Sequence, residues 1–465
     1  MSTSGSGAGV YQQELSRSLS FWEHVFLTVS SVSPAGSVFI FAPALIVSVG
    51  GASVVALIIG AAVAACIGMC YGELAAMYPI AGGEYTWAAR ILGRPVGFAL
   101  FSCTLVGGMG VGAIMGAGAS EYLRFVWPDL SATSTAVVVI ALSTIVATLD
   151  VRTNSWVAGA CFAIEVLLLV VLTILGLMQA SRGVDSMLSP LFVDAAGAIH
   201  AGEWRSLLPV VPVALLMLGG YQNAVYFAEE TTGSTRQLGS AILVSLLAVA
   251  ILQFVPLSAV IVGAGSLSRL MTAQSPMSDF VRERGGQALS TAMSIGIALA
   301  IINGLIVAIN VWARILFASA RDRSWPPVVD RMLATVHVRL RTPVAATLVV
   351  GAVSISLSFL PFNWLLTTTA GVGVMQFVVV GLSALRVRGV AHPTKGGYRM
   401  PVWPLPPVAV IVASLALLYD SFQNSPSGIA ASLVILLVGL AYYYGFIRPN
   451  PERWSLPSVI RNDAQ

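Results

Sequence analysis

Two runs decide the fold of this chain: Ser30-Ser31-Val32-Ser33-Pro34-Ala35-Gly36-Ser37 near its start, and Leu218-Gly219-Gly220-Tyr221-Gln222-Asn223 near its middle. Each run places helix breakers or small polar residues inside a stretch that is long and apolar enough to cross a lipid bilayer. A break at membrane depth frees backbone N–H and C=O groups, which are costly unless they face protein or a wet cavity. Two such breaks in the two halves of a chain indicate a transporter's binding site.

The composition places most of the chain in lipid. Apolar residues make up 57% of the sequence and charged residues 9%, whereas a soluble domain is usually about 25% charged; the mean hydropathy is +0.87. The 465 residues have room for about twelve spans of ~20 residues plus loops. We expect an all-α membrane protein with spans at 21–49, 53–77, 96–125, 132–149, 155–179, 209–229, 238–264, 288–320, 343–360, 363–385, 404–422 and 428–446.

The basic residues predict the orientation of these spans. Most of the 24 Lys and Arg fall on the side that holds both termini, above all in the loops 321–341 and 386–399. Because such loops stay in the cytoplasm, both termini should be cytoplasmic, as an even number of spans requires. The polar first twenty residues precede a full span, so we expect no cleavable signal peptide but a multi-pass protein of the cytoplasmic (inner) membrane. The expected divisions are a tail at 1–20, a transporter domain at 21–446 and a tail at 447–465.

Residue usage argues against several other classes of protein. The net charge of +4 reflects topology, and no nucleic-acid partner is expected. The cysteines lie within expected spans, where free Cys packs as a small hydrophobe, and the histidines are scattered, so no metal site is expected. No nucleophile–base pair is recognisable, so we expect neither an enzyme nor a cofactor. The residues concerned are Cys66, Cys70, Cys103, Cys161, His24, His200, His337 and His392.

Several motifs together resemble one family, the amino acid–polyamine–organocation (APC) transporters, in the manner of a bacterial amino acid permease. They keep the family's order and spacing across roughly residues 20 to 400. The motifs are Tyr71-Gly72-Glu73-Leu74 with Pro79-Ile80-Ala81-Gly82-Gly83-Glu84-Tyr85, then Gly220-Tyr221 with Ala228-Glu229-Glu230, and Arg321-Asp322 with Pro326 and Thr342-Pro343.

The resemblance implies a five-plus-five inverted repeat with discontinuous helices 1 and 6. The repeats would cover about 21–179 and 209–385, with two further helices at 404–446. It also implies a small-molecule substrate, an amino acid or related amine, held at the bilayer midplane between helices 1, 3, 6, 8 and 10. The two breaks indicate the same place independently. A monomer and a homodimer are both compatible with the sequence.

At the first break, the chain has Ala35-Gly36-Ser37-Val38-Phe39 where the family usually reads Gly-Ser/Thr-Gly-Ile-Phe. Pro34 removes a donor and disfavours helix in the residue before it, and Gly36 tolerates unusual torsions. The half-helix beyond presents free N–H groups that suit a carboxylate; a kinked, packed helix is the alternative. The substrate-binding residues predicted here are Ser33, Pro34, Ala35, Gly36 and Ser37.

At the second break, the chain is predicted to unwind and aim carbonyl oxygens at a substrate ammonium group. Tyr221 either packs on the substrate or is a helix-contact aromatic with its hydroxyl satisfied. Gln222 and Asn223 are polar at membrane depth and should face protein or water. The substrate-binding residues predicted here are Leu218, Gly219, Gly220, Tyr221 and Asn223.

Glu165 is the acid furthest from any span end, and we predict a coupling role for it. It falls where several family members carry a lysine that stands in for a bound sodium ion and bridges helices 1 and 8, so the sign of the charge is reversed here. An ionised carboxylate at the bilayer centre is costly, which suits a group that is protonated in one state of a cycle and charged in another. The alternative is a permanently protonated acid bonded to a neighbouring backbone group.

Asn310 is the second predicted coupling residue. It lies seven residues after Asn303, hence on the same helix face, and should point toward the first break, where it could hold a substrate, a water or Glu165. An interhelical hydrogen bond explains it equally well.

Two further sets of residues are interpreted as structural. Gly108, Gly112 and Gly116 recur every four residues, which favours close helix packing over a substrate-facing surface. Charges at cytoplasmic span ends resemble parts of the family's inner gate: Glu73, Glu84, Glu229, Glu230 and Asp322.

The sequence favours a secondary active transporter that works by alternating access with proton symport through Glu165, and it leaves two alternatives open. An amino acid or amine exchanger is the first; sodium coupling is the weaker case, because no Ser/Thr pair is evident near Asn310. A non-transporting amino acid sensor of the same fold is the second, against which the short tails argue.

Overall fold

A computed structural model gives the fold and describes residues 20–78, 83–149, 155–178, 180–194, 198–227, 235–337, 340, 342–390 and 397–454, with the backbone alone at 155–158, 226–227 and 235–236. Some predictions therefore lie outside the described residues. They concern the motif part 79–82, Glu229, Glu230, the first tail up to residue 19, and the last tail beyond residue 454.

Helices make up most of the described chain, because a helix satisfies its own backbone groups at membrane depth. The first half holds α1 (Phe21–Val32), α2 (Pro34–Val49), α3 (Ser53–Met77), α4 (Glu84–Ile91), α5 (Arg94–Val126), α6 (Ala132–Thr148) and α7 (Ser155–Met178). The second half holds α8 (Val211–Leu218), α9 (Thr235–Gly263), α10 (Leu267–Thr272), α11 (Pro276–Arg321), α12 (Pro327–Leu333), α13 (Val344–Leu357), α14 (Phe362–Val390), α15 (Leu405–Asn424) and α16 (Pro426–Tyr442).

Eight helical segments in the described residues are long and apolar enough to cross a membrane, and the first of them, Phe21–Met77, holds α1, α2 and α3. Three shorter apolar helices, Ala132–Thr148, Trp204–Leu218 and Val344–Leu357, lie where further spans were expected. The chain is thus a mostly helical, multi-pass membrane protein, and the count of twelve stays a prediction. The expected span 288–320 belongs to the longer α11, which is interrupted at Gly286 (φ 81°).

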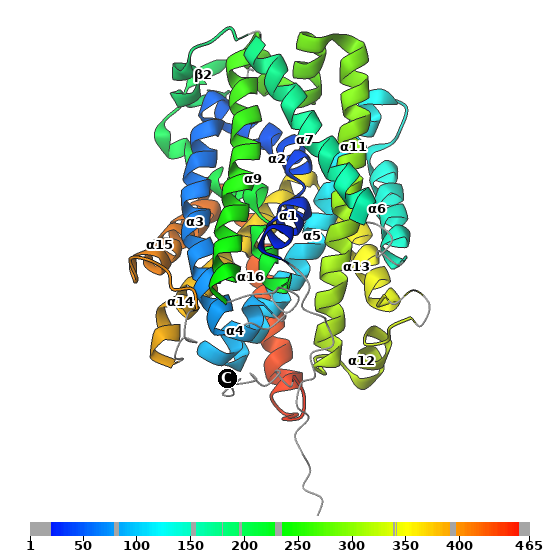
Figure 1. The fold of residues 1–465 in the computed structure, drawn as a ribbon, viewed down its shortest axis with the longest axis vertical. Coiled ribbons are helices and arrows are strands. Elements are labelled where there is room, and N and C mark those ends of the chain that lie inside the picture. Colours follow the sequence, from blue (N-terminus) through cyan, green and yellow to red (C-terminus); the bar gives the residue numbers. More distant parts are fainter. Residues whose placement is uncertain are drawn as a thin grey trace, which may run out of the picture.

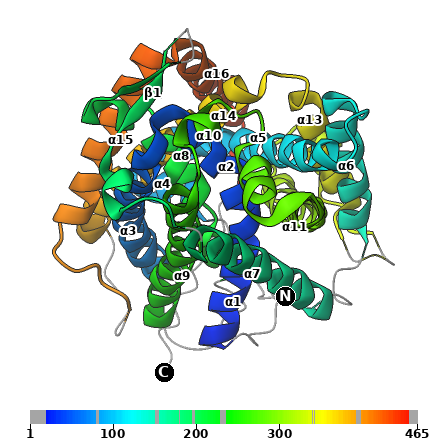
Figure 2. The same cartoon turned by 90° about the horizontal axis from the view of Figure 1, so that it is seen from above.

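The helices form one bundle in which α5 packs against α11, α14, α6 and α16, while α9 packs against α3 and α7 (Figures 1 and 2). α1 and α2 run through the interior, between α7, α9 and α11. Glu23 and Ser20 fix the start of α1 in a reciprocal cap: the Ser20 N–H donates to Glu23 Oε2 at 2.8 Å and the Glu23 N–H donates to Ser20 Oγ at 3.4 Å.

The connection between α7 and α8 contains structure that the sequence did not predict. After the short helix η3 (Val184–Leu188), strands β1 (Leu191–Val193) and β2 (Ile199–Ala201) pair antiparallel with Phe192 opposite His200. The helix η4 (Trp204–Leu207) then leads to α8. In Figure 1 the β-hairpin lies at the top of the bundle and α12 at the bottom.

The last helix also continues further than expected. A short π-helix, η6 (Tyr443–Ile447), extends α16. The segment 448–454, predicted as the start of a tail, packs on the bundle and buries Trp454.

Candidate substrate site at the helix breaks

The first break lies at Ser33. α1 ends at Val32 and α2 begins at Pro34, and Ser33 between them has left-handed backbone angles of φ 50° and ψ 73°. Pro34 explains the position, because it lacks an N–H and disfavours helical torsions in the preceding residue. The Ser37 hydroxyl donates to the Val32 carbonyl oxygen at 3.2 Å. The first turn of α2 therefore directs its N–H groups at the break.

The second break lies at Gly219 and Gly220. α8 ends at Leu218; Gly219 is extended (φ −58°, ψ 154°) and Gly220 has a φ of 108°, a region that favours glycine. The helix η5 (Tyr221–Phe227) follows. The Gly220 N–H donates to Gln222 Oε1 at 3.0 Å, and the Asn223 N–H donates to the Gly220 carbonyl oxygen at 2.9 Å. Both breaks thus lie where the sequence predicted them.

The two breaks touch each other. A Cβ built on Gly220 would lie 2.9 Å from Val32 Cγ2 and 3.2 Å from Val32 Cα. Val32 ends α1 and Gly220 follows α8, so this contact brings the start of α2 and the end of α8 into the same region, and these two helices also pack on each other. Because a helix N-terminus is partially positive and a C-terminus partially negative, the pair presents both charges that a zwitterion requires.

Glu165 reaches the first break from α7. Its side chain is 1% exposed, and its carboxyl group lies against the Ser33 hydroxyl and the Ala35 backbone N–H. Neither Ser33 Oγ nor Glu165 Oε2 completes a hydrogen bond of standard geometry, so the contact is close without being fully satisfied. The sequence predicted a deep acid; the structure adds that it lies at the backbone of the break.

Helix α11 covers the other side of the first break through Gly304 and Ile301. A Cβ on Gly304 would lie 2.9 Å from Ser33 Cβ, and one on Gly36 would lie 3.6 Å from Ile301 Cγ1. Asn310 is half-buried and lies six residues beyond Gly304, so it points about 120° away around the helix. The recorded contacts of the Glu165 carboxyl group are with Ser33 and Ala35, and not with Asn310 as predicted. The coupling role of Asn310 stays a prediction.

The Tyr221 side chain points to α3. It is buried, and its hydroxyl donates to the Ala64 carbonyl oxygen at 3.2 Å, as the packing alternative requires; contact with a substrate stays a prediction.

Two polar contacts join α1 to η5 beside the breaks. His24 Nε2 donates to the Ala224 carbonyl oxygen at 2.9 Å, and Asn223 Nδ2 donates to Ser31 Oγ at 3.4 Å. The sequence missed His24, because nothing in its local pattern predicts a partner 200 residues away.

The three glycines of α5 are packing positions. Gly108 faces the Trp312 ring on α11, Gly112 faces Ser354 on α13, and Gly116 faces Ile140 on α6. A side chain at any of them would collide with a neighbouring helix. The structure thus supports close packing, the interpretation that the sequence favoured.

Glu73 forms a buried ion pair that links α3 to α14. Its carboxylate accepts from Arg388 Nε at 2.6 Å, from Arg388 Nη2 at 2.9 Å and from the Met400 N–H at 3.0 Å. These donors compensate the loss of hydration that burial imposes. The sequence predicted Glu73 as a gate residue without a partner; the basic loop 386–399 was the available signal.

Asp322 and Glu84 are the other gate residues that the structure describes. Asp322 follows α11 with its Oδ1 3.5 Å from Arg321 Nε; burial raises the pKa of Asp322 to about 6, and the charge of Arg321 opposes the shift. Glu84 begins α4 and is buried. Within the described residues, no three His, Cys, Asp or Glu side chains gather as metal ligands. The gate roles stay predictions.

Comparison with known proteins identifies relatives along most of the chain. A family model described as "Amino acid permease" matches residues 19–445. An uncharacterised transporter of Mycobacterium tuberculosis is 29% identical over 345 residues, which cover 74% of each chain. Asc-type amino acid transporter 1 of Homo sapiens is 26% identical over 85% of this chain and 76% of its own. The branched-chain amino acid permease BcaP of Lactococcus lactis subsp. cremoris is 22% identical over 84% and 85%.

The fold has a solved counterpart in the crystal structure of a manganese transporter of Eremococcus coleocola. The two structures align with a TM-score of 0.58 at 12% identity, over 95% of this chain and 99% of that one. At this identity the likeness shows the fold alone. The family match confirms the resemblance drawn from the sequence motifs: the chain belongs to the amino acid permease family of the APC superfamily and is a membrane transporter rather than an enzyme.

Proposed function

We propose that this protein is a secondary active transporter that moves an amino acid or related amine by alternating access, with proton symport through Glu165. The proposal includes twelve spans, the five-plus-five inverted repeat and cytoplasmic termini. The observation that carries it is the contact between the two helix breaks, with the buried carboxyl group of Glu165 against one of them.

The substrate is proposed to bind across the two breaks. Its carboxylate accepts from the N–H groups at the first turn of α2, around Ala35 and Gly36, which have no partners within the helix. Its ammonium group donates to carbonyl oxygens at the end of α8, around Leu218 and Gly219. The absence of side chains at Gly36 and Gly220 lets Ser33 and Val32 pack directly on the backbone, which brings the two breaks close together.

Coupling follows from competition for one donor. Glu165 lies against the Ala35 N–H, which the substrate carboxylate is proposed to use. An ionised Glu165 repels that carboxylate, whereas a protonated Glu165 is neutral and can give up the donor. Proton binding and substrate binding therefore favour each other, and by linkage each raises the affinity for the other. After the substrate leaves, Glu165 releases its proton and returns to the break.

Uptake into proteoliposomes tests the proposal. A labelled panel of amino acids and amines is added with and without an outside-acid pH gradient. We expect at least one α-amino acid to accumulate above equilibrium, and the accumulation to collapse with a protonophore. A methyl ester of that amino acid, which lacks the carboxylate, should not compete. Counterflow without any response to the gradient would identify an exchanger, a sodium requirement would exclude Glu165 as the coupling group, and binding without uptake would identify a sensor.

A further inference from the structure

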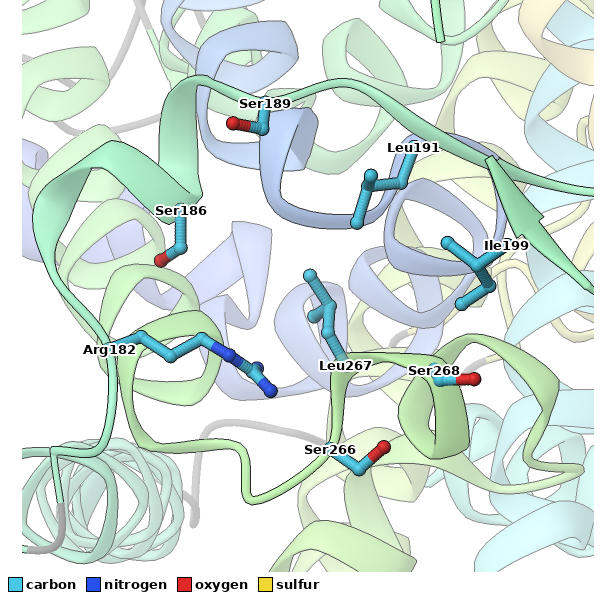
Figure 3. A pocket seen from close by; sticks show the side chains of 8 residues that line it. All are labelled: Arg182, Ser186, Ser189, Leu191, Ile199, Ser266, Leu267 and Ser268. Atoms are coloured by element: carbon cyan, nitrogen blue, oxygen red, sulfur yellow. The ribbon is translucent and has the colours of Figure 1, made fainter. Parts of the chain in front are cut away.

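A pocket lined by both polar and apolar side chains lies beside the β-hairpin (Figure 3). Its volume is about 380 Å³, within the range of small-molecule sites. It is lined by Arg182, Ser186 and Ser189 before β1, by Leu191 and Ile199 of the hairpin, and by the start of α10 around Leu267. Three separate segments of the chain thus converge on it.

Arg182 supplies a cation without a counter-charge. Its Nη2 donates to the Gly265 carbonyl oxygen at 3.3 Å, while its Nη1 is buried without a hydrogen-bond partner. It forms no ion pair with the carboxylates of the described residues. Arginine is always charged, and its planar fork matches a carboxylate. The unsatisfied donor therefore favours an oxyanion.

Other charged groups around Arg182 do not fill that role. Asp185 is exposed, with Oδ1 folded against Gly183. Glu283 and Arg284 lie beside Gly265, and the Glu283 carboxylate forms no ion pair with Arg182.

The rest of the lining fits the other parts of an amino acid. The Ser186 hydroxyl donates to the Gly183 carbonyl oxygen at 2.7 Å and the Ser189 hydroxyl to that of Asp185 at 3.2 Å. With its hydrogen engaged, each oxygen keeps lone pairs that can accept from an ammonium group. In Figure 3 the Arg182 guanidinium extends toward the centre of the pocket, and the apolar side chains of Leu191, Ile199 and Leu267 lie across from it.

The pocket lies next to the C-terminal end of α2, the helix that begins at the first break. Leu191 and Met271 both pack on Gly50, the C-cap of α2: a Cβ there would lie 2.9 Å from Leu191 Cβ and 3.0 Å from Met271 Sδ. The Ser186 carbonyl packs on Gly51. A ligand in the pocket therefore lies above the outer end of the proposed substrate route.

We propose that this pocket is an outer capture site for an α-amino acid with an apolar side chain. The carboxylate binds Arg182, the ammonium group binds the Ser186 and Ser189 oxygens, and the side chain lies over Leu191, Ile199 and Leu267. The site holds substrate at the outer face before it enters the route to the breaks. This inference rests on the proposed function and on the proposed orientation, which places the hairpin outside the cell.

A local fluorescent reporter tests the pocket directly. Val184 is 69% exposed beside Arg182, so Val184→Cys should accept bimane without disturbing the fold. L-leucine is the probe, with acetate and methylammonium as its separate charged parts. We expect a saturable response to L-leucine, weakened about tenfold or more by Arg182→Gln, as loss of a charge-assisted bond predicts. Acetate should compete weakly, and methylammonium should give no response.

Three variants make the result decisive. Arg269→Gln removes the same charge from an exposed position of α10 outside the pocket lining and should leave the response unchanged. Arg182→Lys keeps the charge without the planar fork and should fall between wild type and Arg182→Gln. In uptake assays, Arg182→Gln should raise the apparent KM and leave the maximal rate unchanged. Equal responses of Arg182→Gln and Arg269→Gln would overturn the proposal.

The reporter also separates this inference from the proposed function, because it does not depend on transport. Uptake of L-leucine with a silent reporter would overturn the pocket and leave the transporter standing. A leucine response without uptake of any panel member would support the pocket's ligand and remove the proposed function.

Discussion

Glu165 brings a carboxyl group to the backbone donors that a substrate carboxylate also needs. Its side chain is 1% exposed, and one of its oxygens has no hydrogen-bond partner. A buried charge of this kind is costly unless its neighbours satisfy it, and Ser33 and Ala35 are the neighbours at hand. A charged Glu165 and a bound substrate carboxylate therefore oppose each other at the first turn of α2.

The variant Glu165→Gln tests this opposition. Glutamine keeps the shape of the protonated acid but cannot titrate. We expect gradient-driven accumulation in proteoliposomes to fall to passive equilibration, while exchange of internal for external substrate survives, because exchange does not require the proton to leave. Glu121→Gln is the matched control: Glu121 is half-buried on α5, where it contacts Ser275 instead of a helix break, and gradient-driven accumulation should persist.

Two other outcomes would change the role of Glu165. A wild-type pH dependence in Glu165→Gln would make it a structural group. Complete loss of binding would make it a direct ligand of a substrate amine, and so favour a cationic substrate.

Part of this residue-scale chemistry is predictable from the sequence. Pro34 predicts a break because its ring acts on adjacent torsions, and Glu165 is recognisable as a deep acid from its apolar flanks. Their contact is not predictable, because it depends on how α7 packs on α2. Asn310 shows how far a prediction from helical spacing can go. The spacing fixes which residues share a face of the helix, but it does not tell which neighbouring element that face contacts. Gly304 and Ile301 take the place against the break.

At the scale of elements, the two broken helices depend on close approach at Gly220. Its φ of 108° strains any L-residue, and Val32 leaves no room for a Cβ. We expect Gly220→Ala to lower the free energy of unfolding by about 1–2 kcal/mol and to abolish the thermal stabilisation that substrate gives wild type. The control is Gly373→Ala on α14, where an added Cβ would have no neighbouring atom within 4 Å. This variant should keep the thermal stabilisation by substrate.

A second variant separates loss of the site from loss of the fold. Gly36→Leu places a side chain against Ser33 Oγ, 2.8 Å from the new Cβ, at a helical position without positive φ. Substrate-dependent stabilisation that persists in both Gly220→Ala and Gly36→Leu would rule out a site between the breaks.

The segment 448–454, which we call the strap, packs against the start of α5 and against the connection between α11 and α12. Arg453 Nη1 donates to Asp330 Oδ2 at 3.1 Å and to the Trp325 carbonyl oxygen. Arg94, at the start of α5, donates to the Arg453 carbonyl oxygen at 2.8 Å. Trp454 is 1% exposed. The strap therefore joins α5 to the α11–α12 connection, which composition alone could not reveal.

A double-mutant cycle measures this link. Arg453→Ala should destabilise the protein by about 1–3 kcal/mol, because it leaves the largely buried Asp330 carboxylate without its cation and with the Trp325 N–H as its remaining recorded donor. Asp330→Ala should cost a similar amount, and the double variant should be less destabilised than the sum of the two, with a coupling of at least ~0.5 kcal/mol. Arg448→Ala is the control, since the contact recorded for the Arg448 guanidinium among the described residues is with the exposed Tyr444 ring. Additive single effects would show that the strap holds through other contacts.

For the whole molecule, the apolar runs predict that the chain is a membrane protein and where its long helices lie. A continuous apolar run of about 20 residues pairs its backbone N–H and C=O groups within lipid by forming a helix. The hairpin, the short helices between spans and the strap were not predictable. Each depends on a partner distant in sequence: Leu191 packs on Gly50, and Arg453 on Asp330. The interruption at Gly286, by contrast, falls two residues before the start of the expected span 288–320, within the glycine pair Gly285-Gly286.

The orientation of the whole bundle is the last prediction. Val328 on α12 is 79% exposed and Val184 beside the hairpin is 69% exposed, and their two elements lie at opposite ends of the bundle (Figure 1). The basic loop around α12 predicts a cytoplasmic end. In intact cells a membrane-impermeant maleimide should therefore label Val184→Cys, and should label Val328→Cys only after permeabilisation, each in a background without the native cysteines. The reverse pattern would place the hairpin pocket in the cytoplasm. The pocket would then meet substrate after transport, and its proposed role in capture would fall with the orientation.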